Sequence, residues 1–228
     1  MYTTIVFDLD GTLLDTLDDL TAAVNFALAK NGCAERTREE VRGFVGNGIV
    51  KLMERAIGLS AENAPDSIAK NAKGADFSVI FEDFKTYYKE NCSVYTKPYE
   101  GIMELLSALK NRGLKLALLS NKADYAVKIL AKEYFGDLFL EAIGENEAAG
   151  IRKKPAPDSL FAVLERLGAE KKTTVYVGDS EVDIQTAKNA GVDCISVTWG
   201  FKNKAFLVEN GGEIFVDLPM EILNFCKE

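Results

Sequence analysis

Histidine is absent from the 228 residues of this chain. Without an imidazole, serine–histidine and cysteine–histidine nucleophilic mechanisms are excluded, and so are histidine ligands to a metal. Any acid–base chemistry near neutral pH must therefore be carried out by carboxylates, lysine, tyrosine or cysteine.

Cysteine is scarce, and long apolar runs are missing. The four cysteines, Cys33, Cys92, Cys194 and Cys226, form no Cys-x-x-Cys pair, which favours thiols in a reducing compartment over a zinc site or a disulfide framework. No apolar run approaches the ~18 residues that a membrane span requires. The first residues, MYTTIVFD, lack the basic segment and apolar stretch of a secretory signal. We expect a cytoplasmic protein.

Basic residues are fewer than acidic residues, 27 against 35, which gives a net charge of -8. An acidic protein repels phosphate backbones and anionic lipid, so we expect neither nucleic acid nor a membrane as partner. An anionic substrate would need a locally positive site. The hydrophobic content of 47% is enough for one sizeable core, or for a core with a small second domain.

Short apolar runs of strand-forming residues recur along the chain, and from residue 98 onward they alternate with helical patterns. Alternating strands and helices indicate a parallel sheet that is covered by helices on both faces. We therefore predict an α/β fold whose core is a doubly wound, Rossmann-like parallel sheet. The expected strands are Thr4–Phe7, Leu114–Leu119, Glu141–Ile143, Val175–Val177, Cys194–Val197 and, more weakly, Ile214–Val216.

Residues 16–92 break this alternation, because their apolar residues recur with helical spacing and form no convincing strand. One helical stripe consists of Leu17, Leu20, Val24, Ala27 and Leu28. A helical block between the first and second strands indicates an inserted domain. We expect a core of residues 1–15 and 93–228 and an all-helical cap domain of residues 16–92.

Polar clusters occur at, or shortly after, the ends of four predicted strands, where ligands of open parallel sheets bind. They are Asp8 with Asp10, Ser120 with Asn121, Lys154, and Asp179 with Asp183. Four neighbouring carboxylates would repel one another unless a hard cation lay among them, and Mg²⁺ prefers oxygen ligands. A dication held by carboxylates also suits an incoming phosphate. The sequence therefore predicts a Mg²⁺ site at which one carboxylate attacks a phosphoryl group.

Each cluster also has an ordinary structural interpretation. Asp10-Gly11 is compatible with a hairpin turn, Ser120-Asn121 with a helix cap, and Lys154 with a solvated loop cation. The segment GDS at residues 178–180 is compatible with a turn that caps the next helix. Their occurrence in order at successive strand ends favours a common site over four coincidences.

With these motifs in view, the sequence resembles the haloacid dehalogenase superfamily of phosphohydrolases. The segments DLDGTL, LLSN, KKPAP and GDSEVD resemble the four family motifs in order, and the resemblance spans nearly the whole chain. The helical insertion resembles the family's cap between the first and second strands. The segments RGFVGNGIVKLMERA, KPYEGI and VTWGF resemble the phosphoglycolate phosphatase branch. That branch often has histidine where Ala156 stands here.

The resemblance implies roles for the residues of the first motif. Asp8 would be the nucleophile that forms an aspartyl-phosphate and would also bind Mg²⁺. Asp10 would act as general acid and then as general base, and its backbone carbonyl would reach the metal. Thr12 would steady the motif loop and help to hold the phosphate.

The other motifs receive roles in the same way. Ser120 and the backbone around Asn121 would hold the phosphoryl oxygens. Lys154 would balance charge between the nucleophile and the phosphate. Asp179 would bind Mg²⁺, with Asp183 supporting the metal directly or through water.

The predicted cap contains the stretch RGFVGNG, in which Gly46 and Gly48 interrupt a helical pattern. A plain turn between two helices is the simpler interpretation. Because Arg42 supplies a cation in an acidic protein, we expect this loop to contact the carboxylate of a small substrate such as phosphoglycolate.

The predicted activity is therefore that of a Mg²⁺-dependent phosphatase acting on a small phosphate monoester, with phosphoglycolate as the first candidate. A pyrophosphatase, a nucleotidase and a phosphoglucomutase-like phosphotransferase share the same motifs and remain alternatives. A non-enzymatic phosphoacceptor signalling module has a similar acidic pocket, but its chain would be about half as long and would have no cap. The expected partner is a small phosphorylated metabolite, and the expected assembly is a monomer or a homodimer.

Overall fold

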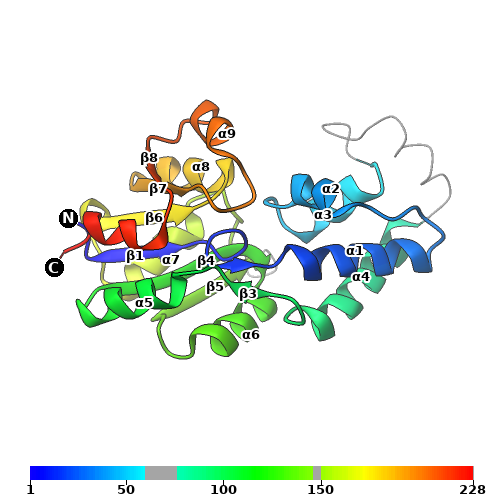
Figure 1. The fold of residues 1–228 in the computed structure, drawn as a ribbon, viewed down its shortest axis with the longest axis horizontal. Coiled ribbons are helices and arrows are strands. Elements are labelled where there is room, and N and C mark those ends of the chain that lie inside the picture. Colours follow the sequence, from blue (N-terminus) through cyan, green and yellow to red (C-terminus); the bar gives the residue numbers. More distant parts are fainter. Residues whose placement is uncertain (60–75, 146–149, 228) are drawn as a thin grey trace. The chain divides into compact units, whose positions relative to one another are not determined.

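The computed structural model describes residues 1–59, 76–145 and 150–227 (Figure 1). The chain divides into two compact units, one of Met1–Asp15 with Lys97–Glu228 and one of Thr16–Thr96. The chain thus leaves the first unit directly after its first strands and returns to it at residue 97.

The first unit is built on a six-stranded parallel sheet with the order β5-β4-β1-β6-β7-β8. The central position of β1 between β4 and β6 places its carboxyl end beside the ends of both neighbours. The predicted α/β fold with a parallel, doubly wound sheet is confirmed. The strands are β1 (Thr4–Phe7), β4 (Lys115–Ala123), β5 (Glu141–Glu145), β6 (Thr174–Gly178), β7 (Asp193–Val197) and β8 (Ile214–Val216).

Apolar residues fill both faces of the central strands, as a sheet covered on two sides requires. All four residues of β1 are buried. On one face, side chains of the central strands pack against α7 (Asp158–Leu167) and α8 (Glu181–Ala190) in a cluster that includes Val6, Tyr176 and Leu160. The helices α5 (Ile102–Asn111) and α6 (Asp124–Phe135) pack on β4 and β5 from the other side (Figure 1).

Smaller elements complete the first unit. A two-stranded antiparallel ribbon pairs β2 (Leu14–Asp15) with β3 (Lys97–Pro98), so the two chain segments that join the units are hydrogen-bonded to each other. The sequence pattern did not predict this ribbon, because two-residue strands carry no periodicity. The described part of this unit also contains η2 (Lys171–Thr173), α9 (Lys204–Glu209) and η3 (Pro219–Phe225).

The strand β4 is longer than its apolar run predicts. It continues through Ser120 and Asn121 to Ala123, with a shift in its register to β5 between Leu119 and Ala123. The two polar residues therefore lie within an irregular stretch of the strand instead of beyond its end. The predicted strand stopped at Leu119 because the next residues are polar. In the structure the backbone pairing continues, because the polar side chains find hydrogen-bond partners.

The second unit contains four described helices, which are α1 (Leu17–Lys30), α2 (Arg38–Phe44), α3 (Ile49–Ala56) and α4 (Phe77–Asn91). The predicted stripe on α1 is buried, and α1 packs against α4. The helical pattern is interrupted where expected, since α2 ends at Phe44 and α3 begins at Ile49. Among the described residues of both units, no helix is long and apolar enough to span a bilayer.

Candidate active site

A tight loop after β1 presents the first two acidic residues. The amide of Asp8 donates to the carbonyl of Val177 at 2.9 Å, which extends the pairing of β1 with β6. The carbonyl of Leu9 then accepts hydrogen bonds from the amides of Leu13 and Leu14, both at 3.0 Å. The side chain of Asp8 is turned back, because its Oδ1 accepts from the amide of Leu9 at 2.7 Å. The loop thus fixes a buried carboxylate at the carboxyl end of the central strand.

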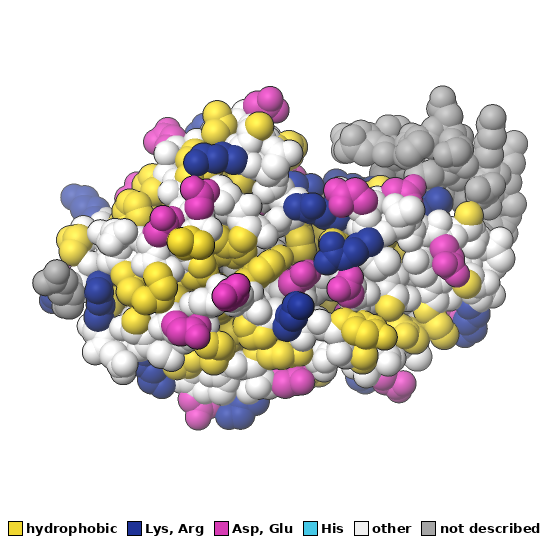
Figure 2. Space-filling view, in the orientation of Figure 1, with side chains coloured by type: hydrophobic (Ala, Val, Ile, Leu, Met, Phe, Trp, Pro, Cys, Tyr) yellow, Lys and Arg dark blue, Asp and Glu magenta, His cyan; other side chains and the backbone are white. Residues whose placement is uncertain are grey.

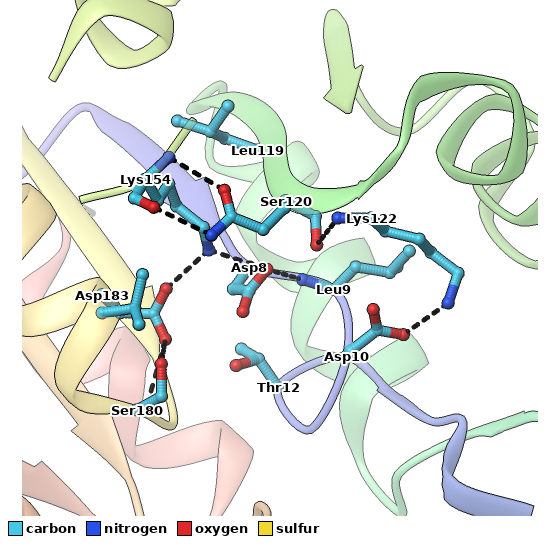
Figure 3. Close-up of polar contacts among 12 residues, drawn as sticks. Asp8, Leu9, Asp10, Thr12, Leu119, Ser120, Lys122, Lys154, Ser180 and Asp183 are labelled. Carbon is cyan, nitrogen blue, oxygen red and sulfur yellow. Dashed lines mark hydrogen bonds and ion pairs between the residues drawn. The ribbon is translucent and has the colours of Figure 1, made fainter. Parts of the chain in front are cut away.

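The ammonium of Lys154 lies against that carboxylate (Figure 3). Its Nζ is 3.0 Å from Oδ1 of Asp8, 2.7 Å from Oδ1 of Asp183 and 3.0 Å from the hydroxyl of Tyr176. Three acceptors match the three N–H donors of an ammonium. The side chain of Lys154 is 3% exposed, so this cation is held between two carboxylates and away from solvent.

The backbone of Lys154 is fixed by Asn121. The side-chain amide of Asn121 donates to the carbonyl of Lys154 at 3.0 Å and accepts from its amide at 2.8 Å. This pair of hydrogen bonds ties β4 to the loop that carries the lysine. Ser120 is also buried, and its Oγ accepts from the amide of Lys122 at 3.3 Å. Of the two predicted phosphate-binding residues of this motif, Asn121 therefore contacts the predicted charge-balancing lysine, while Ser120 contacts Lys122.

The turn from β6 into α8 carries the other two acids. Oδ2 of Asp183 accepts from the amide of Ser180 at 3.1 Å and from its hydroxyl at 2.7 Å, in a capping box at the start of α8. A Cβ on Gly178 would lie 2.3 Å from Cγ of Asp183, so the backbone approaches this carboxylate more closely than any side chain would permit. Asp183, which is fully buried, thus has a fixed orientation.

Asp179 is held by contacts other than those of Asp183. Its Oδ2 accepts from the amide of Phe201 at 2.7 Å, and its Oδ1 accepts from the hydroxyl of Thr12 at 3.4 Å. Thr12 is fully buried, and its carbonyl accepts from the indole N–H of Trp199 at 3.0 Å. The hydroxyl of Thr12 therefore joins the loop of the first motif to Asp179, while its role toward a phosphate stays a prediction.

Asp10 has a different environment from the other three acids. Its Oδ1 is 2.9 Å from Nζ of Lys122, and its side chain is 13% exposed, compared with 1% for the lysine. Figure 3 shows this pair set apart from the pair of Asp8 and Lys154. The two acids of the first motif are thus contacted by different cations.

Burial and mutual repulsion decide the protonation of the acidic cluster. Burial, together with the charges of Asp183 and Asp10, raises the pKa of Asp8 to about 7, although Lys154 and the Leu9 amide act in the opposite direction. Burial and the neighbouring carboxylates of Asp183 and Asp8 raise the pKa of Asp179 well above its usual range. These carboxylates therefore hold protons more tightly than free aspartate does unless a further cation joins them.

The donor set fits a hard divalent cation. Asp8, Asp179 and Asp183 are all buried, and each offers a carboxylate oxygen such that the three oxygens lie within 4.8 Å of one another. Oxygen donors at this spacing suit Mg²⁺. A dication would also stabilise the ionised forms that burial disfavours. The cluster can therefore hold a metal ion, and its chemistry favours Mg²⁺ over softer metals.

The predicted cap residues lie in the second unit. Gly46, with φ of 124°, and Gly48, with φ of 85°, occupy the break between α2 and α3. Arg55 braces this break, because its guanidinium donates to the carbonyl of Phe44 and to Oδ1 of Asn47, both at 2.8 Å. The nearby guanidinium of Arg42 is 3.7 Å from Glu39. The glycines therefore form a defined helix–helix connection, while the role of this loop toward a substrate remains a prediction.

Two residues of the site escaped the sequence analysis. Lys122 lies only two positions after Ser120, and a lysine so close to a predicted phosphate-binding serine was a usable signal. Tyr176 gave no such signal, because a tyrosine inside an apolar strand pattern is most simply explained as core. Its hydroxyl donates to the carbonyl of Leu119 at 2.8 Å while accepting from Lys154.

Comparisons with known proteins identify the family. Residues 5–197 match the family of haloacid dehalogenase-like hydrolases. The phosphoglycolate phosphatase of Pseudomonas syringae pv. tomato is 33% identical over 225 residues, covering 98% of this chain and 79% of the relative. The phosphoglycolate phosphatase of Aquifex aeolicus is 34% identical over 203 residues, covering 86% of this chain and 85% of the relative.

A solved structure agrees equally well. It is that of a Lactobacillus delbrueckii subsp. bulgaricus protein assigned provisionally as a phosphoglycolate phosphatase. This structure aligns with a TM-score of 0.90 at 37% identity, covering 100% of this chain and 99% of the other.

The fold, the ordered acidic site and these similarities define a phosphohydrolase of the Rossmann-like type. The chain belongs to the haloacid dehalogenase-like hydrolase family. It is a phosphoric monoester hydrolase, which confirms the predicted class of enzyme and excludes the non-enzymatic signalling module.

Proposed function

We propose that this chain is a Mg²⁺-dependent phosphatase that hydrolyses phosphoglycolate through an aspartyl-phosphate on Asp8. The observation that carries the proposal is the contact of a buried carboxylate, Asp8, with a buried ammonium, Lys154, at 3.0 Å on the carboxyl end of the central strand. A nucleophilic carboxylate must approach an anionic phosphoryl group, and an adjacent cation reduces the repulsion between them.

In the first step, an oxygen of Asp8 attacks phosphorus while the bond from phosphorus to the ester oxygen breaks. Asp10 donates a proton to the ester oxygen, which leaves as the alcohol. In the second step, Asp10 takes a proton from water as the water oxygen attacks phosphorus. Inorganic phosphate leaves, and the carboxylate of Asp8 is restored.

The remaining residues orient these groups. Ser120 and the backbone near Asn121 hold the phosphoryl oxygens, while the Asn121 side chain fixes the backbone of Lys154. Asp8, Asp179, Asp183 and the backbone carbonyl of Asp10 would hold Mg²⁺. When bound, Mg²⁺ neutralises the charge that builds up on the phosphoryl oxygens. Asp183 would support the metal directly or through water.

The choice of substrate is supported by the relatives from Pseudomonas syringae and Aquifex aeolicus, whose names specify phosphoglycolate. A core that recognises only a phosphoryl group and a metal cannot tell one ester from another, so other groups must select the substrate. We assign the unit of Met1–Asp15 and Lys97–Glu228 as the catalytic core and Thr16–Thr96 as the cap. The loop of Arg42, Gly46 and Gly48 would contact the substrate carboxylate.

The proposed setting is the bacterial cytoplasm, with a small phosphorylated metabolite as partner and a monomer or homodimer as assembly. The scattered cysteines, none of them in a disulfide in the structure, suit a reducing compartment. On the face of the catalytic unit seen in Figure 2, acidic and basic side chains are interspersed with apolar ones, which gives nucleic acid no basic stripe to follow there.

The test is an assay of the purified chain with Mg²⁺ against phosphoglycolate, inorganic pyrophosphate, nucleoside monophosphates and β-glucose 1-phosphate. The proposal predicts the highest kcat/KM for phosphoglycolate. Preference for pyrophosphate, for a nucleotide or for the sugar phosphate would replace the substrate but leave the mechanism intact. Failure to release phosphate from any of them would reject the proposed function.

A further inference from the structure

The ammonium of Lys122 is the nearest cation described for Asp10, and nothing in the sequence motifs assigns it a role. Its Nζ lies 2.9 Å from Oδ1 of Asp10, and its side chain is 1% exposed. Both residues belong to the same compact unit, and the backbone of Lys122 is itself anchored through Ser120. Both partners of this contact therefore belong to the unit that carries the acidic site.

Stability is a weak reason for such a pair. Withdrawing an ammonium from water costs more than a single contact with a partly exposed carboxylate generally returns, and apolar replacements of buried pairs are often neutral. A long side chain also loses rotamer freedom when it is buried. A buried lysine that contacts the predicted general acid is better explained by what it does to the geometry of that acid.

Asp10 needs such a constraint. Its side chain is 13% exposed and lies against Lys122, while backbone amides, Lys154 and a helix cap hold Asp8 and Asp183. A carboxylate on one short side chain can turn about χ1 and χ2, and a general acid works only within hydrogen-bond distance of the leaving oxygen. An ammonium that donates to Oδ1 disfavours a proton on that oxygen, so the transferable proton of Asp10 belongs on Oδ2.

We propose that Lys122 is a positioning residue for proton transfer: it holds Oδ1 of Asp10 so that Oδ2 faces the leaving group and, later, the attacking water. The inference rests on the proposed function. It assigns Lys122 to the alcohol side of the reaction, in contrast to Lys154, which contacts the nucleophile on the phosphoryl side.

The experiment compares Lys122→Met with wild type on two substrates in pre-steady-state kinetics with saturating Mg²⁺. Phosphoglycolate has a poor leaving group that requires a proton, whereas p-nitrophenyl phosphate has a good one that needs little protonation. We expect the rate of enzyme phosphorylation to fall roughly 10²-fold for phosphoglycolate and less than about threefold for p-nitrophenyl phosphate.

A second signature separates positioning from a loss of folding. With p-nitrophenyl phosphate, Lys122→Met should release one p-nitrophenol per enzyme in a fast burst and then turn over slowly, because hydrolysis of the aspartyl-phosphate still needs Asp10 as base. Lys122→Arg keeps the cation. With phosphoglycolate, its rate of enzyme phosphorylation should be at least about tenfold higher than that of Lys122→Met. Lys128→Met on the exposed part of α6 serves as the matched control and should behave as wild type.

Equal losses of the phosphorylation rate on both substrates would overturn the proposal, because Lys122 would then act on the phosphoryl group or on the fold. Unchanged rates on both would overturn it as well. Either result with an active wild-type enzyme leaves the proposed phosphatase function standing. A wild-type enzyme that releases phosphate from neither substrate would reject that function and this inference together.

Discussion

Gly11 lies so close to the carboxylate of Asp179 that a Cβ on the glycine would be 2.3 Å from Oδ2. The backbone of Gly11 also has φ of 81°, which disfavours any other residue. The first motif and the fourth motif are therefore packed directly against each other, and the space that a methyl group would need is taken by a proposed metal ligand.

Gly11→Ala should displace Asp179 and weaken Mg²⁺ binding by at least tenfold, measured by isothermal titration of the metal. The matched control is Gly191→Ala, because Gly191 has a similar φ of 71° but nothing within 4 Å of the added Cβ. Both variants should lose roughly 1–2 kcal/mol of unfolding free energy from backbone strain. Equal Mg²⁺ affinities for the two variants would contradict a metal role for Asp179.

Lys154→Met should destabilise the metal-free protein by about 3–5 kcal/mol, because it leaves the buried carboxylates of Asp8 and Asp183 without their shared cation. Unfolding in urea at pH 7 with a chelator present measures the change. Lys128→Met, which removes an exposed lysine, should cost no more than about 1 kcal/mol. A similar small loss for both lysines would mean that the acidic cluster does not depend on Lys154 for charge balance.

The raised pKa of Asp8 predicts a pH dependence of stability. The ordinary value is 3.8 and the folded value about 7, so between these pH values the folded state binds more protons than the unfolded chain. The contribution of Asp8 to the free energy of unfolding therefore falls as pH rises through this window. The Asp8→Asn variant lacks this titrating group. Without metal, its free energy of unfolding minus that of the wild type should therefore rise by roughly 1–4 kcal/mol from pH 4 to pH 7.5.

Urea titrations of both proteins at several pH values, with a chelator present, measure that difference. Subtracting the two curves cancels the contributions of groups far from Asp8, so the difference reports Asp8 together with the neighbouring groups whose pKa values its charge shifts. A difference that stays constant across the window would show that Asp8 titrates as an ordinary exposed carboxylate.

Arg42→Ala should reduce kcat/KM for phosphoglycolate by roughly tenfold to a hundredfold while changing that for p-nitrophenyl phosphate little. A guanidinium contact with the substrate carboxylate is available to the first substrate only. Arg38→Ala is a suitable control, because this neighbouring arginine on α2 is 48% exposed and paired with Asp18. Uniform losses on both substrates, or none, would leave the loop of Gly46 and Gly48 as a plain turn.

Much of the fold was predictable because its signals are periodic. Short apolar runs of three to six residues predicted β1 and the other strands of the six-stranded sheet, and the helical stripe of α1 predicted a buried face. The ribbon of β2 and β3 was not predictable, since a two-residue pairing depends on where two distant segments meet. The extension of β4 through Ser120 and Asn121 was missed for a related reason, because tertiary partners overrode the local polarity.

In the candidate site, too, some features were predictable from the sequence and others depended on tertiary contacts. The motif order brought Asp8, Lys154, Asp179 and Asp183 together as expected, because parallel strands end at one edge of the sheet. What the pattern could not supply was the direction of each side chain. The turn of Asn121 toward the backbone of Lys154 and the pairing of Asp10 with Lys122 depend on atoms more than thirty residues apart in the chain.

Covalent phosphate on Asp8 is the central claim, and trapping it is the most direct measurement. The enzyme is mixed with p-nitrophenyl phosphate and Mg²⁺, quenched in acid within milliseconds, reduced with borohydride, digested and examined by mass spectrometry. Reduction of an aspartyl-phosphate converts the residue to homoserine, and we expect this conversion at Asp8, with none in the Asp8→Asn variant. An active enzyme with unmodified Asp8, or with the conversion at another carboxylate, would contradict the proposed mechanism.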